Sequence, residues 1–375
     1  MQKKKVVIIG AGFAGLASVQ YLCRYSHIAD VVVVDRYENS HFRPLIPDIV
    51  SGRVKAQNLL YPILPLRERL GFTFYCEPVR EIDFNTNVIT MLESKIKYDY
   101  LIFTAGSQTT IPPTDTFRHY ALRLDSVHDA SHVRNDIINR KYECIVVCGG
   151  GYTGIELSAN LQQLIRNSGI CAKVIIVEMV DKLVSTLPGW MSSYITQNLA
   201  SQGIQICLSS KVKDLTESSV QLSNGEKFEN ALCIWTTGLE SSTLARTLDV
   251  KKDRKGRIDV DQMLHFKENC FAAGDAVCFN VKNECARMSV QCSLDQGRLA
   301  AQNVISQISG MPLKKYVHRD PGFIVPLSNA KACGEVFGIP VKGMQAVFLH
   351  YLLSTYRSKG IYNRLAVLKA ALKAF

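Results

Sequence analysis

The 375-residue chain has twelve cysteines but no CxxC pair. Zinc ribbons and thioredoxin-like redox pairs both need such close spacing, so neither is indicated. The cysteines lie singly along the chain, and Cys144 and Cys148 flank the apolar residues 145–147. A cysteine in such a run behaves as a small hydrophobic residue. We therefore expect a protein of a reducing, cytoplasmic compartment rather than a disulfide scaffold.

The chain also lacks an apolar run long enough to cross a bilayer. Its longest uncharged stretch near the start, residues 6–23, follows three lysines and so resembles a signal peptide. A membrane span needs about 20 apolar residues, and three glycines interrupt this stretch at positions 10, 12 and 15. We interpret it as a strand, a turn and a helix.

Acidic residues are absent from positions 341–375, which carry six lysines and arginines. The whole chain has a formal net charge of +11, so more than half of the excess lies in this tail. This charge predicts an anionic partner for the C-terminus. No RNP-like motif, zinc module or helix-turn-helix signal supports nucleic acid, which leaves an acidic membrane surface as the expected partner.

The first nucleotide-binding pattern begins with the β-branched run at residues 6–9, typical of a buried parallel strand. Gly10, Gly12 and Gly15 follow, then a helix-compatible segment and a valine-rich strand that ends in Asp35. Gly10 permits a tight turn, Gly12 lets the backbone approach a pyrophosphate, and Gly15 lets the helix pack closely on the strand. Asp35 can accept hydrogen bonds from a ribose. Together these features predict a dinucleotide site.

The same pattern recurs later in the chain. Residues 144–148 form the predicted strand, and Gly149, Gly151 and Gly154 take the positions of the three glycines. The next predicted strand ends in Glu178. Two complete patterns indicate two dinucleotides, and hence electron transfer between them.

The acid at the end of the second pattern bears on the choice of nucleotide. Glu178 can accept a hydrogen bond from a 2′-hydroxyl group and repels a 2′-phosphate, so we expect NADH rather than NADPH. Lys182 lies near enough in the sequence to weaken this preference.

Glu156 is the polar exception within the second glycine turn and its helix, placed where a nicotinamide is expected to lie. Two interpretations remain open. The residue is either a solvated helix position, or a group that orients the nicotinamide or assists proton transfer.

The C-terminal tail predicts two amphipathic helices separated by Gly360. The first apolar face comprises Met344, Val347, Phe348, Tyr351 and Leu352. The second comprises Ile361, Leu365, Leu368, Leu372 and Phe375. The uncharged residues 343–356 are too few to span a bilayer, so basic helices lying in the membrane interface are favoured. The alternative is that both helices pack on the body or form a homodimer interface.

In these motifs the chain resembles flavoproteins of the pyridine nucleotide-disulfide oxidoreductase superfamily, and more closely the type II NADH:quinone oxidoreductases. The resemblance covers almost the whole chain. It is carried by GAGFAG at 10–15, residues 35–45, YDYLIFTAGS at 98–107, GGGYTGIE at 149–156, FAAGDA at 271–276, residues 290–297 and the basic tail.

The resemblance implies that the first pattern holds FAD and the second holds NADH. It also implies that Asp275 binds the ribityl chain, that the backbone near Val79 faces the adenine, and that Gln291 lies beside the flavin ring and a quinone pocket. Glu156 and Gln291 are the expected catalytic residues, and no metal is implied. The expected cofactor-binding residues are Gly10, Gly12, Phe13, Ala14, Gly15, Asp35, Arg36, Arg43, Val79, Ala105, Gly106, Gly149, Gly151, Tyr152, Thr153, Gly154, Glu178, Gly238, Gly274, Asp275, Gln291 and Cys292.

The chain departs from the family at a few positions. It has Thr104-Ala105-Gly106 where relatives usually have Ala-Thr-Gly, and Asp295 replaces a second glutamine, with Gln296 beside it. Residues 36–75 contain no cysteine, whereas disulfide reductases need a CxxxxC pair beside the flavin. Cys292 and Cys333 are isolated and are interpreted as packing residues, so we expect hydride transfer without a protein thiol relay.

The composition, 47% hydrophobic and 21% charged, is that of a globular protein. We expect an α/β fold with two Rossmann-like dinucleotide-binding domains and C-terminal amphipathic helices. The predicted domains are a discontinuous FAD domain (1–112 and 258–326), an inserted NADH domain (113–257) and a membrane and quinone segment (327–375).

The predicted function is electron transfer from NADH through FAD to menaquinone or ubiquinone, without proton pumping. The predicted location is the inner face of the cell membrane, as a peripheral protein. Two alternatives are a sulfide:quinone or other thiol-linked flavoprotein reductase, and a non-catalytic flavoprotein that senses NADH.

Overall fold

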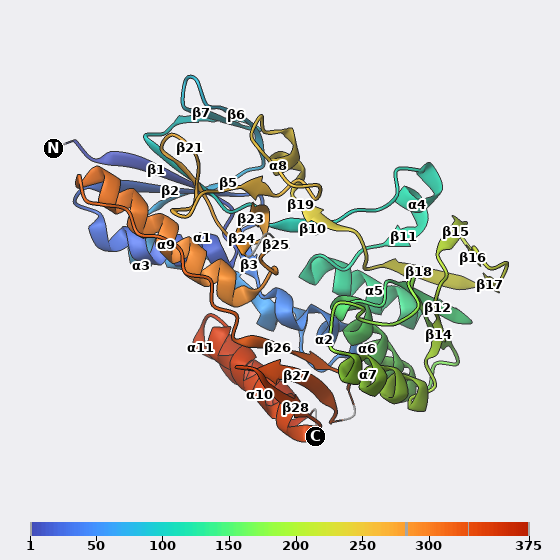
Figure 1. Cartoon of the computed structure of the whole chain (residues 1–375). Helices are drawn as coiled ribbons and strands as arrows, with labels where there is room; N and C mark the ends of the chain where they lie inside the picture. Colours follow the sequence, from blue (N-terminus) through green and yellow to red (C-terminus); the bar gives the residue numbers. More distant parts are fainter. Residues whose placement is uncertain (1, 282–283, 329, 374–375) are drawn as a thin grey trace. The chain divides into compact units, whose positions relative to one another are not determined.

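Figure 1 shows the computed structural model of the chain, which describes residues 2–281, 284–328 and 330–373. Internal contacts divide the chain into two units. The first contains residues 1–40, 62–108 and 239–320, and the second contains residues 41–61, 109–238 and 321–375. This division differs from the predicted domain boundaries, because residues 239–257 group with the first unit whereas residues 41–61 and the tail group with the second.

The first unit is built on a sheet with the strand order β21-β22-β9-β1-β2-β5. β1 pairs in parallel with both β2 and β9, and Val6, Val7 and Ile8 have no exposed surface. A β-branched run covered on both faces is the expected centre of such a sheet. The bounds are β1 (Lys4–Ile9), β2 (Ala29–Asp35), β5 (Thr73–Cys76), β9 (Tyr100–Phe103), β21 (His265–Lys267) and β22 (Cys270–Ala272).

Two helices of the first unit, α1 (Phe13–Leu22) and α9 (Val290–Ile308), lie side by side (Figure 1). A Cβ on Gly297 would lie 2.1 Å from the carbonyl oxygen of Ala14, so only glycine allows this approach. The Ser18 hydroxyl donates a 2.8 Å hydrogen bond to Gly297 O. The helix that follows the first glycine turn is thereby held against α9.

Shorter elements complete the first unit. β6, β7 and β8 form a small antiparallel sheet, and Val79 is the first residue of β6. The bounds are η1 (Cys23–Tyr25), α3 (Ile63–Leu70), β6 (Val79–Asp83), β7 (Val88–Met91), β8 (Lys95–Lys97), β19 (Leu239–Ser241), α8 (Thr243–Thr247), β20 (Ile258–Asp259), η4 (Gly274–Ala276), β23 (Val277–Cys278), β24 (Asn280–Val281) and β25 (Glu284–Cys285). Three short strands contain residues of both units: β3 (Asn39–His41), β4 (Leu60–Pro62) and β10 (Ser107–Thr109).

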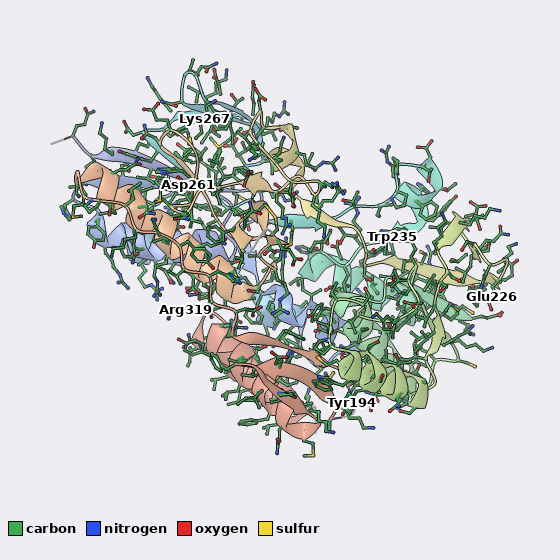
Figure 2. All side chains as sticks on the ribbon, in the orientation of Figure 1. Tyr194, Glu226, Trp235, Asp261, Lys267 and Arg319 are labelled. Atoms are coloured by element: carbon green, nitrogen blue, oxygen red, sulfur yellow. A yellow bond between two sulfur atoms is a disulfide. The ribbon has the colours of Figure 1, made fainter. Side chains whose placement is uncertain are left out.

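The second unit contains a parallel sheet with the order β11-β18-β12-β13-β14. Ile145, Val146 and Val147 of its central strand have no exposed surface. Beside the sheet, Trp235 (Figure 2) donates from Nε1 to Thr110 O at 3.1 Å, and its ring packs edge-on against Phe117. The bounds are β11 (Ala121–Leu122), β12 (Cys144–Cys148), β13 (Lys173–Val177), β14 (Gln205–Cys207) and β18 (Ala231–Trp235). The predicted α/β class with two Rossmann-like domains and C-terminal helices is confirmed, and the first sheet is parallel except for the pairing of β21 with β22.

The remaining elements of the second unit include the two tail helices, α10 and α11. Their bounds are η2 (Arg43–Leu45), α2 (Ile46–Ser51), η3 (Ala56–Leu59), α4 (Asp115–Tyr120), α5 (Val127–Asn139), α6 (Tyr152–Ser168), α7 (Gly189–Ser201), β15 (Val212–Leu215), β16 (Ser219–Leu222), β17 (Lys227–Glu229), β26 (Gly322–Pro326), β27 (Ala332–Val336), β28 (Ile339–Lys342), α10 (Met344–Arg357) and α11 (Ile361–Leu372).

The two predicted tail helices are present, separated at Gly360, but their apolar faces divide between the interior and the surface. Val347 and Tyr351 of α10 are buried, whereas Met344, Phe348 and Leu352 are exposed. On α11 the whole described part of the predicted stripe is exposed, and the helix instead buries Val367, Ala370 and Ala371. Phe375, the last member of that stripe, lies outside the described residues.

Two further findings concern membranes and cysteines. Among the described helices, none is both long and apolar enough to cross a membrane. Cys278 and Cys285 form a disulfide, and the other ten cysteines are free. The sequence analysis did not predict this bond, because a spacing of seven residues across a hairpin carries no recognised motif.

Candidate functional site

The first glycine turn follows β1, and its shape requires glycine at two positions. Gly10 has φ +99°, a conformation that residues with a side chain rarely adopt. A Cβ on Gly15 would lie 1.8 Å from Gly10 O, so a side chain there would push α1 away from the turn. The hydroxyl of Thr104 donates to the carbonyl oxygens of Ile9 and Gly10, both at 2.8 Å, and closes the turn from the end of β9.

The space in front of this turn suits a pyrophosphate. A Cβ on Gly12 would meet no described atom within 4 Å, and α1 begins directly after this residue. The first N–H groups of a helix lack partners within the helix and carry its positive dipole end. Beside them, Asp35 accepts hydrogen bonds from Ala11 N at 2.6 Å and Tyr37 N at 2.9 Å. The turn therefore combines phosphate-binding donors with a carboxylate that can accept from a ribose.

The second glycine turn repeats this geometry in the second unit. Gly149 has φ +113°, and a Cβ on Gly154 would lie 1.9 Å from Gly149 O. A Cβ on Gly151 would meet no atom of the described chain within 4 Å. Glu178 accepts from Gly150 N at 2.6 Å, as Asp35 does from the first turn. Both predicted strand–turn–helix–strand–acid arrangements are thus present, and both fit a dinucleotide.

Two threonines complete the turns, and the sequence analysis did not select either as a site residue. Thr236 Oγ1 donates to Cys148 O at 2.8 Å, just as Thr104 does to the corresponding carbonyl of the first turn. A shared sequence pattern could have identified both residues. Each threonine follows a predicted strand and stands two residues before a glycine, Gly106 or Gly238.

Gly274 lies close to the first turn, and Asp275 follows it directly in the chain. A Cβ on Gly274 would lie 3.1 Å from Ala14 Cβ, and Gly274 N donates to Gln296 Oε1 at 2.9 Å. Ser107 Oγ donates to the Asp275 carboxylate at 3.2 Å. Gln296 is buried and holds the turn, a role that sequence reasoning missed because it treated this residue only as a neighbour of Asp295.

Gln291 lies in the first turn of α9, which Ser289 caps by accepting from Cys292 N at 3.2 Å. The Gln291 amide donates to both carboxylate oxygens of Asp295, at 3.1 and 3.0 Å. Asp295, the residue that departs from the family pattern, therefore fixes the orientation of the Gln291 side chain.

Cys292 and Cys333 are both buried, in different units. Burial raises the pKa of Cys292 and raises that of Cys333 to about 12. Thiols in such surroundings remain protonated at neutral pH and react slowly. This environment is consistent with the predicted packing role.

Glu156 lies on α6 and is only partly accessible. Burial, and secondarily the charge of Asp48, raise the pKa of its carboxyl group well above the usual value. Its partial burial means that Glu156 is not the fully solvated helix position of the first interpretation.

Beneath Glu156 lies a buried polar network that the sequence did not reveal. Arg53 and Asp48 form a 3.0 Å ion pair with only 3% and 5% of their side chains exposed. The hydroxyl of Tyr351, on α10, donates to Asp48 at 2.9 Å and accepts from Arg53 at 2.8 Å. Arg53 also donates to Gln163 of α6. The network therefore connects α2, α6 and the first tail helix within one unit.

His350 lies next to this network on α10. Its Nε2 is buried and has no hydrogen-bond partner among the described residues. The pKa of His350 is lowered to about 4, chiefly by burial; the charge of Asp48 opposes this shift, and the positive charges of Arg53 and Arg357 add to it. His350 is therefore neutral in the folded protein at pH 7.

All predicted site residues lie in the described part of the chain, and they are divided between the two units. Arg36 stacks over the Tyr37 ring, with 4.9 Å from its Cζ to the ring centroid. Val79 lies on the separate β6-β7-β8 sheet. The first unit contains Gly10, Gly12, Phe13, Ala14, Gly15, Asp35, Arg36, Val79, Ala105, Gly106, Gly274, Asp275, Gln291 and Cys292. The second contains Arg43, Gly149, Gly151, Tyr152, Thr153, Gly154, Glu156, Glu178 and Gly238.

Comparison with known proteins agrees with the two-turn geometry. Residues 4–297 match the family model described as pyridine nucleotide-disulphide oxidoreductase. Among curated relatives, the demethylphylloquinone reductase NdbB of Synechocystis is 24% identical, over 97% of this chain and 95% of the relative. The type II NADH:quinone oxidoreductase of Staphylococcus saprophyticus is 22% identical, over 94% of each chain.

Solved structures show the same fold at low sequence identity. NDH2 from Plasmodium falciparum, in complex with NADH, has a TM-score of 0.88 at 16% identity and covers 99% of this chain and 98% of its own. The sulfide:quinone oxidoreductase from Aquifex aeolicus has a TM-score of 0.79 at 17% identity, covering 94% of this chain and 90% of its own.

The contrast between Gly15 and Gly12 leads to a first prediction. Gly15→Ala should lower the free energy of unfolding by about 2 kcal/mol or more, because its methyl group would overlap Gly10 O. Gly12→Ala, whose methyl group enters open space, is the matched control and should change stability by less than about 1 kcal/mol. Urea denaturation measures both, and equal losses would contradict the packing role of Gly15.

The lowered pKa of His350 leads to a second prediction. Between pH 6.5 and about 4, the unfolded chain binds a proton at His350 that the folded chain does not, so stability falls as the pH falls through this window. Between pH 7 and 4.5, wild type should lose about 2 kcal/mol more than His350→Gln, since each unit of pKa difference is worth about 1.4 kcal/mol. Urea denaturation at both pH values tests this, and the same pH dependence in both proteins would refute it.

Proposed function

The chain belongs to the pyridine nucleotide-disulphide oxidoreductase family, and on that basis we propose that it is an FAD-dependent NADH:quinone oxidoreductase that does not pump protons. When bound, FAD would supply the redox chemistry that links NADH oxidation to quinone reduction. The names of the full-length relatives, a demethylphylloquinone reductase and type II NADH:quinone oxidoreductases, support this assignment.

The observation that carries the proposal is the pair of glycine turns, each with its own acid. In the first unit, Gly10, Gly12 and Gly15 with Asp35 would hold FAD, and Asp275 would bind its ribityl chain. In the second unit, Gly149, Gly151 and Gly154 would hold NADH. The chain's contribution is to position the two cofactors and to exclude water from them.

Glu178 supports NADH as the donor. Its carboxylate is held beside the second turn by Gly150 N at 2.6 Å and Val180 N at 3.1 Å. A carboxylate fixed in this place accepts from a ribose 2′-hydroxyl group and repels a 2′-phosphate.

Two further residues have proposed roles in proton and electron transfer. Glu156, with its raised pKa, would hold a proton near the nicotinamide or the reacting quinone. Gln291, oriented by Asp295, would lie at the quinone side of the flavin. These are roles for residues of this chain and do not require a thiol.

The tail is proposed to dock the protein on an anionic membrane surface, at the inner face of the cell membrane. Phe348 and Leu365 are 55% exposed, and other apolar side chains of α10 and α11 are exposed too, among them Leu352 and Leu368. At the β27–β28 turn, Phe337 is 79% and Ile339 65% exposed, an apolar projection that the sequence analysis missed. Basic residues accompany these side chains and acidic ones are absent from 341–375. Quinones dissolve in lipid, so a docked tail fits a quinone substrate.

The second candidate function is sulfide:quinone oxidoreduction, because the chain is similar in fold to a sulfide:quinone oxidoreductase. Against it, α6 contains no cysteine, and Cys292 and Cys333 are buried with raised pKa values. Bleaching of the flavin by sulfide, and not by NADH, would favour this candidate.

Stopped-flow spectroscopy tests the proposed function directly. NADH should bleach the flavin absorbance of the purified protein faster than NADPH does, and menaquinone or ubiquinone analogues should restore it.

Gln291→Ala should slow the restoration of flavin absorbance by quinone at least tenfold and leave bleaching by NADH nearly unchanged, whereas Gln302→Ala on the same helix should change neither. Equal loss of both steps in Gln291→Ala would contradict its assigned role, and a protein that stays colourless with added FAD would refute the function.

Vesicle binding tests the docking surface. Phe348→Glu combined with Leu365→Glu should reduce binding to vesicles of anionic phospholipid at least tenfold, because two charges would enter the apolar interface. Ile138→Glu, an exposed apolar position on α5, is the matched control. If the double variant binds vesicles as wild type does, and gel filtration shows that it has lost a dimer, the exposed face is an interface between copies instead.

A further inference from the structure

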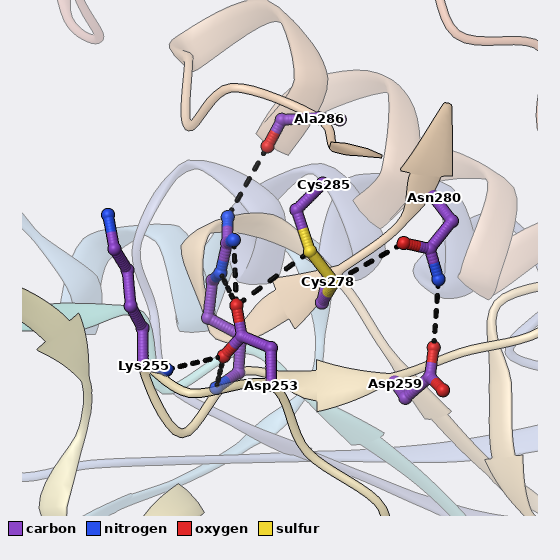
Figure 3. A network of polar contacts seen from close by, with 8 residues as sticks. Asp253, Lys255, Asp259, Cys278, Asn280, Cys285 and Ala286 are labelled. Atoms are coloured by element: carbon purple, nitrogen blue, oxygen red, sulfur yellow. Dashed lines mark hydrogen bonds and ion pairs between the residues drawn. A yellow bond between two sulfur atoms is a disulfide. The ribbon is translucent and has the colours of Figure 1, made fainter. Parts of the chain in front are cut away.

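The segment between the Gly274–Ala276 turn and α9 contains the disulfide between Cys278 and Cys285 (Figure 3). Their Cα atoms are 5.2 Å apart, inside the range of unstrained disulfides. Cys278 is buried, while Cys285 is partly accessible. The pair is distinct from Cys292 and Cys333, and it has no part in the proposed electron transfer.

An ion pair between Asp253 and Arg257 lies beside Cys285. Arg257 donates to Asp253 Oδ2 from Nε at 2.8 Å and forms a 2.7 Å ion pair with it through Nη2. The same guanidinium donates to the carbonyl oxygen of Ala286, the residue after Cys285, at 3.4 Å. Cys285 Sγ lies 3.7 Å from Asp253 Oδ2 (Figure 3). Arg257 is only 8% exposed, so Cys285 and the residue after it lie against a buried ion pair that does not include either sulfur atom.

The disulfide also connects two walls of a small cavity in the first unit. One wall comprises Gly274, Asp275 and Val277, and the opposite wall comprises residues 286–289. α9 closes the cavity through Ser293 and Gln296. Cys278 directly follows the first wall and Cys285 directly precedes the second, so the bond limits how far the walls can separate.

We propose that Cys278 and Cys285 are a reversible oxidation site, which a low-molecular-weight disulfide such as glutathione disulfide closes, and that closure tightens the retention of FAD. The first part depends only on the cysteine pair. The second part rests on the proposed function, since it assigns Asp275 to FAD.

The reaction balances as two thiol–disulfide exchanges. The thiolate of Cys285, the more accessible of the two, attacks one sulfur of glutathione disulfide and releases one glutathione thiolate. The thiolate of Cys278 then attacks Cys285 Sγ in the mixed disulfide and releases the second. Two protein thiols are oxidised, one glutathione disulfide is reduced to two thiols, and the two protons pass to the departing thiolates.

A metal site is the competing interpretation, because Asp253, Cys278 and Cys285 each offer a ligand atom within 4.8 Å of the others. A structural zinc site needs four ligands and separated thiolates. The observed sulfur–sulfur bond favours the oxidation site over this alternative.

Redox titration of the FAD-loaded protein tests the oxidation site. The protein is equilibrated at a series of glutathione to glutathione disulfide ratios, quenched with acid, alkylated and examined by mass spectrometry. We expect Cys278 and Cys285 to lose reactivity together at one ratio and to regain it on reduction. Cys278→Ser should leave Cys285 as a mixed disulfide with glutathione, and Cys171→Ser, at an exposed cysteine, should behave as wild type. Full alkylation of both residues at every ratio, or zinc retained by the reduced protein, would overturn the proposal.

The rate of FAD release tests the coupling to the cavity. Flavin fluorescence after dilution should appear at least threefold faster from the reduced protein and from Cys278→Ser than from the oxidised wild type. Circular dichroism confirms that each variant is folded, and Cys171→Ser is again the control. Equal release from both redox states would overturn the coupling. A protein that never binds FAD would instead refute the proposed function, and the thiol titration would still decide on the oxidation site.

Discussion

Both glycine turns depend on one steric constraint, the contact between the helix and the backbone that precedes it. At Gly15 and Gly154 a β-carbon would lie within 2 Å of a carbonyl oxygen of the turn, so only a hydrogen atom fits. This contact sets the direction in which each helix leaves its strand, and hence where the first N–H groups of the helix point. The positions of Asp35 and Glu178 beside the turns follow from the parallel pairing of the adjacent strands.

The second unit shows how a buried charge organises the tail. An ion pair removed from water is costly unless its members are hydrogen-bonded well, and Tyr351 supplies a hydroxyl to both Asp48 and Arg53. Seating Tyr351 in this network fixes the rotation of α10 about its axis. As a result, Phe348 and Leu352 face outward, and α10 presents part of its apolar face at the surface.

Much of this arrangement could be predicted from the sequence because it is local. The glycine spacings, the β-branched runs and the acids at the strand ends lie within about 30 residues of one another, and they specify both turns. The two tail helices were predicted in the same way, from periodicity and Gly360. Periodicity did not show which side of α11 is buried, because Val367, Ala370 and Ala371 form a second apolar face of smaller residues. The partners of Tyr351 lie about 300 residues away in the chain, and the Cys278–Cys285 bond depends on hairpin geometry, so neither had a local signal.

The network around Tyr351 also limits how the tail can be exchanged in engineering. The outward face of α10 tolerates exchange with another apolar sequence, whereas its inward face is matched to Asp48 and Arg53 at the other end of the chain. A chimaera that takes the last two helices from a relative must therefore also take residues 46–53, or the graft leaves an arginine and an aspartate buried without their third partner.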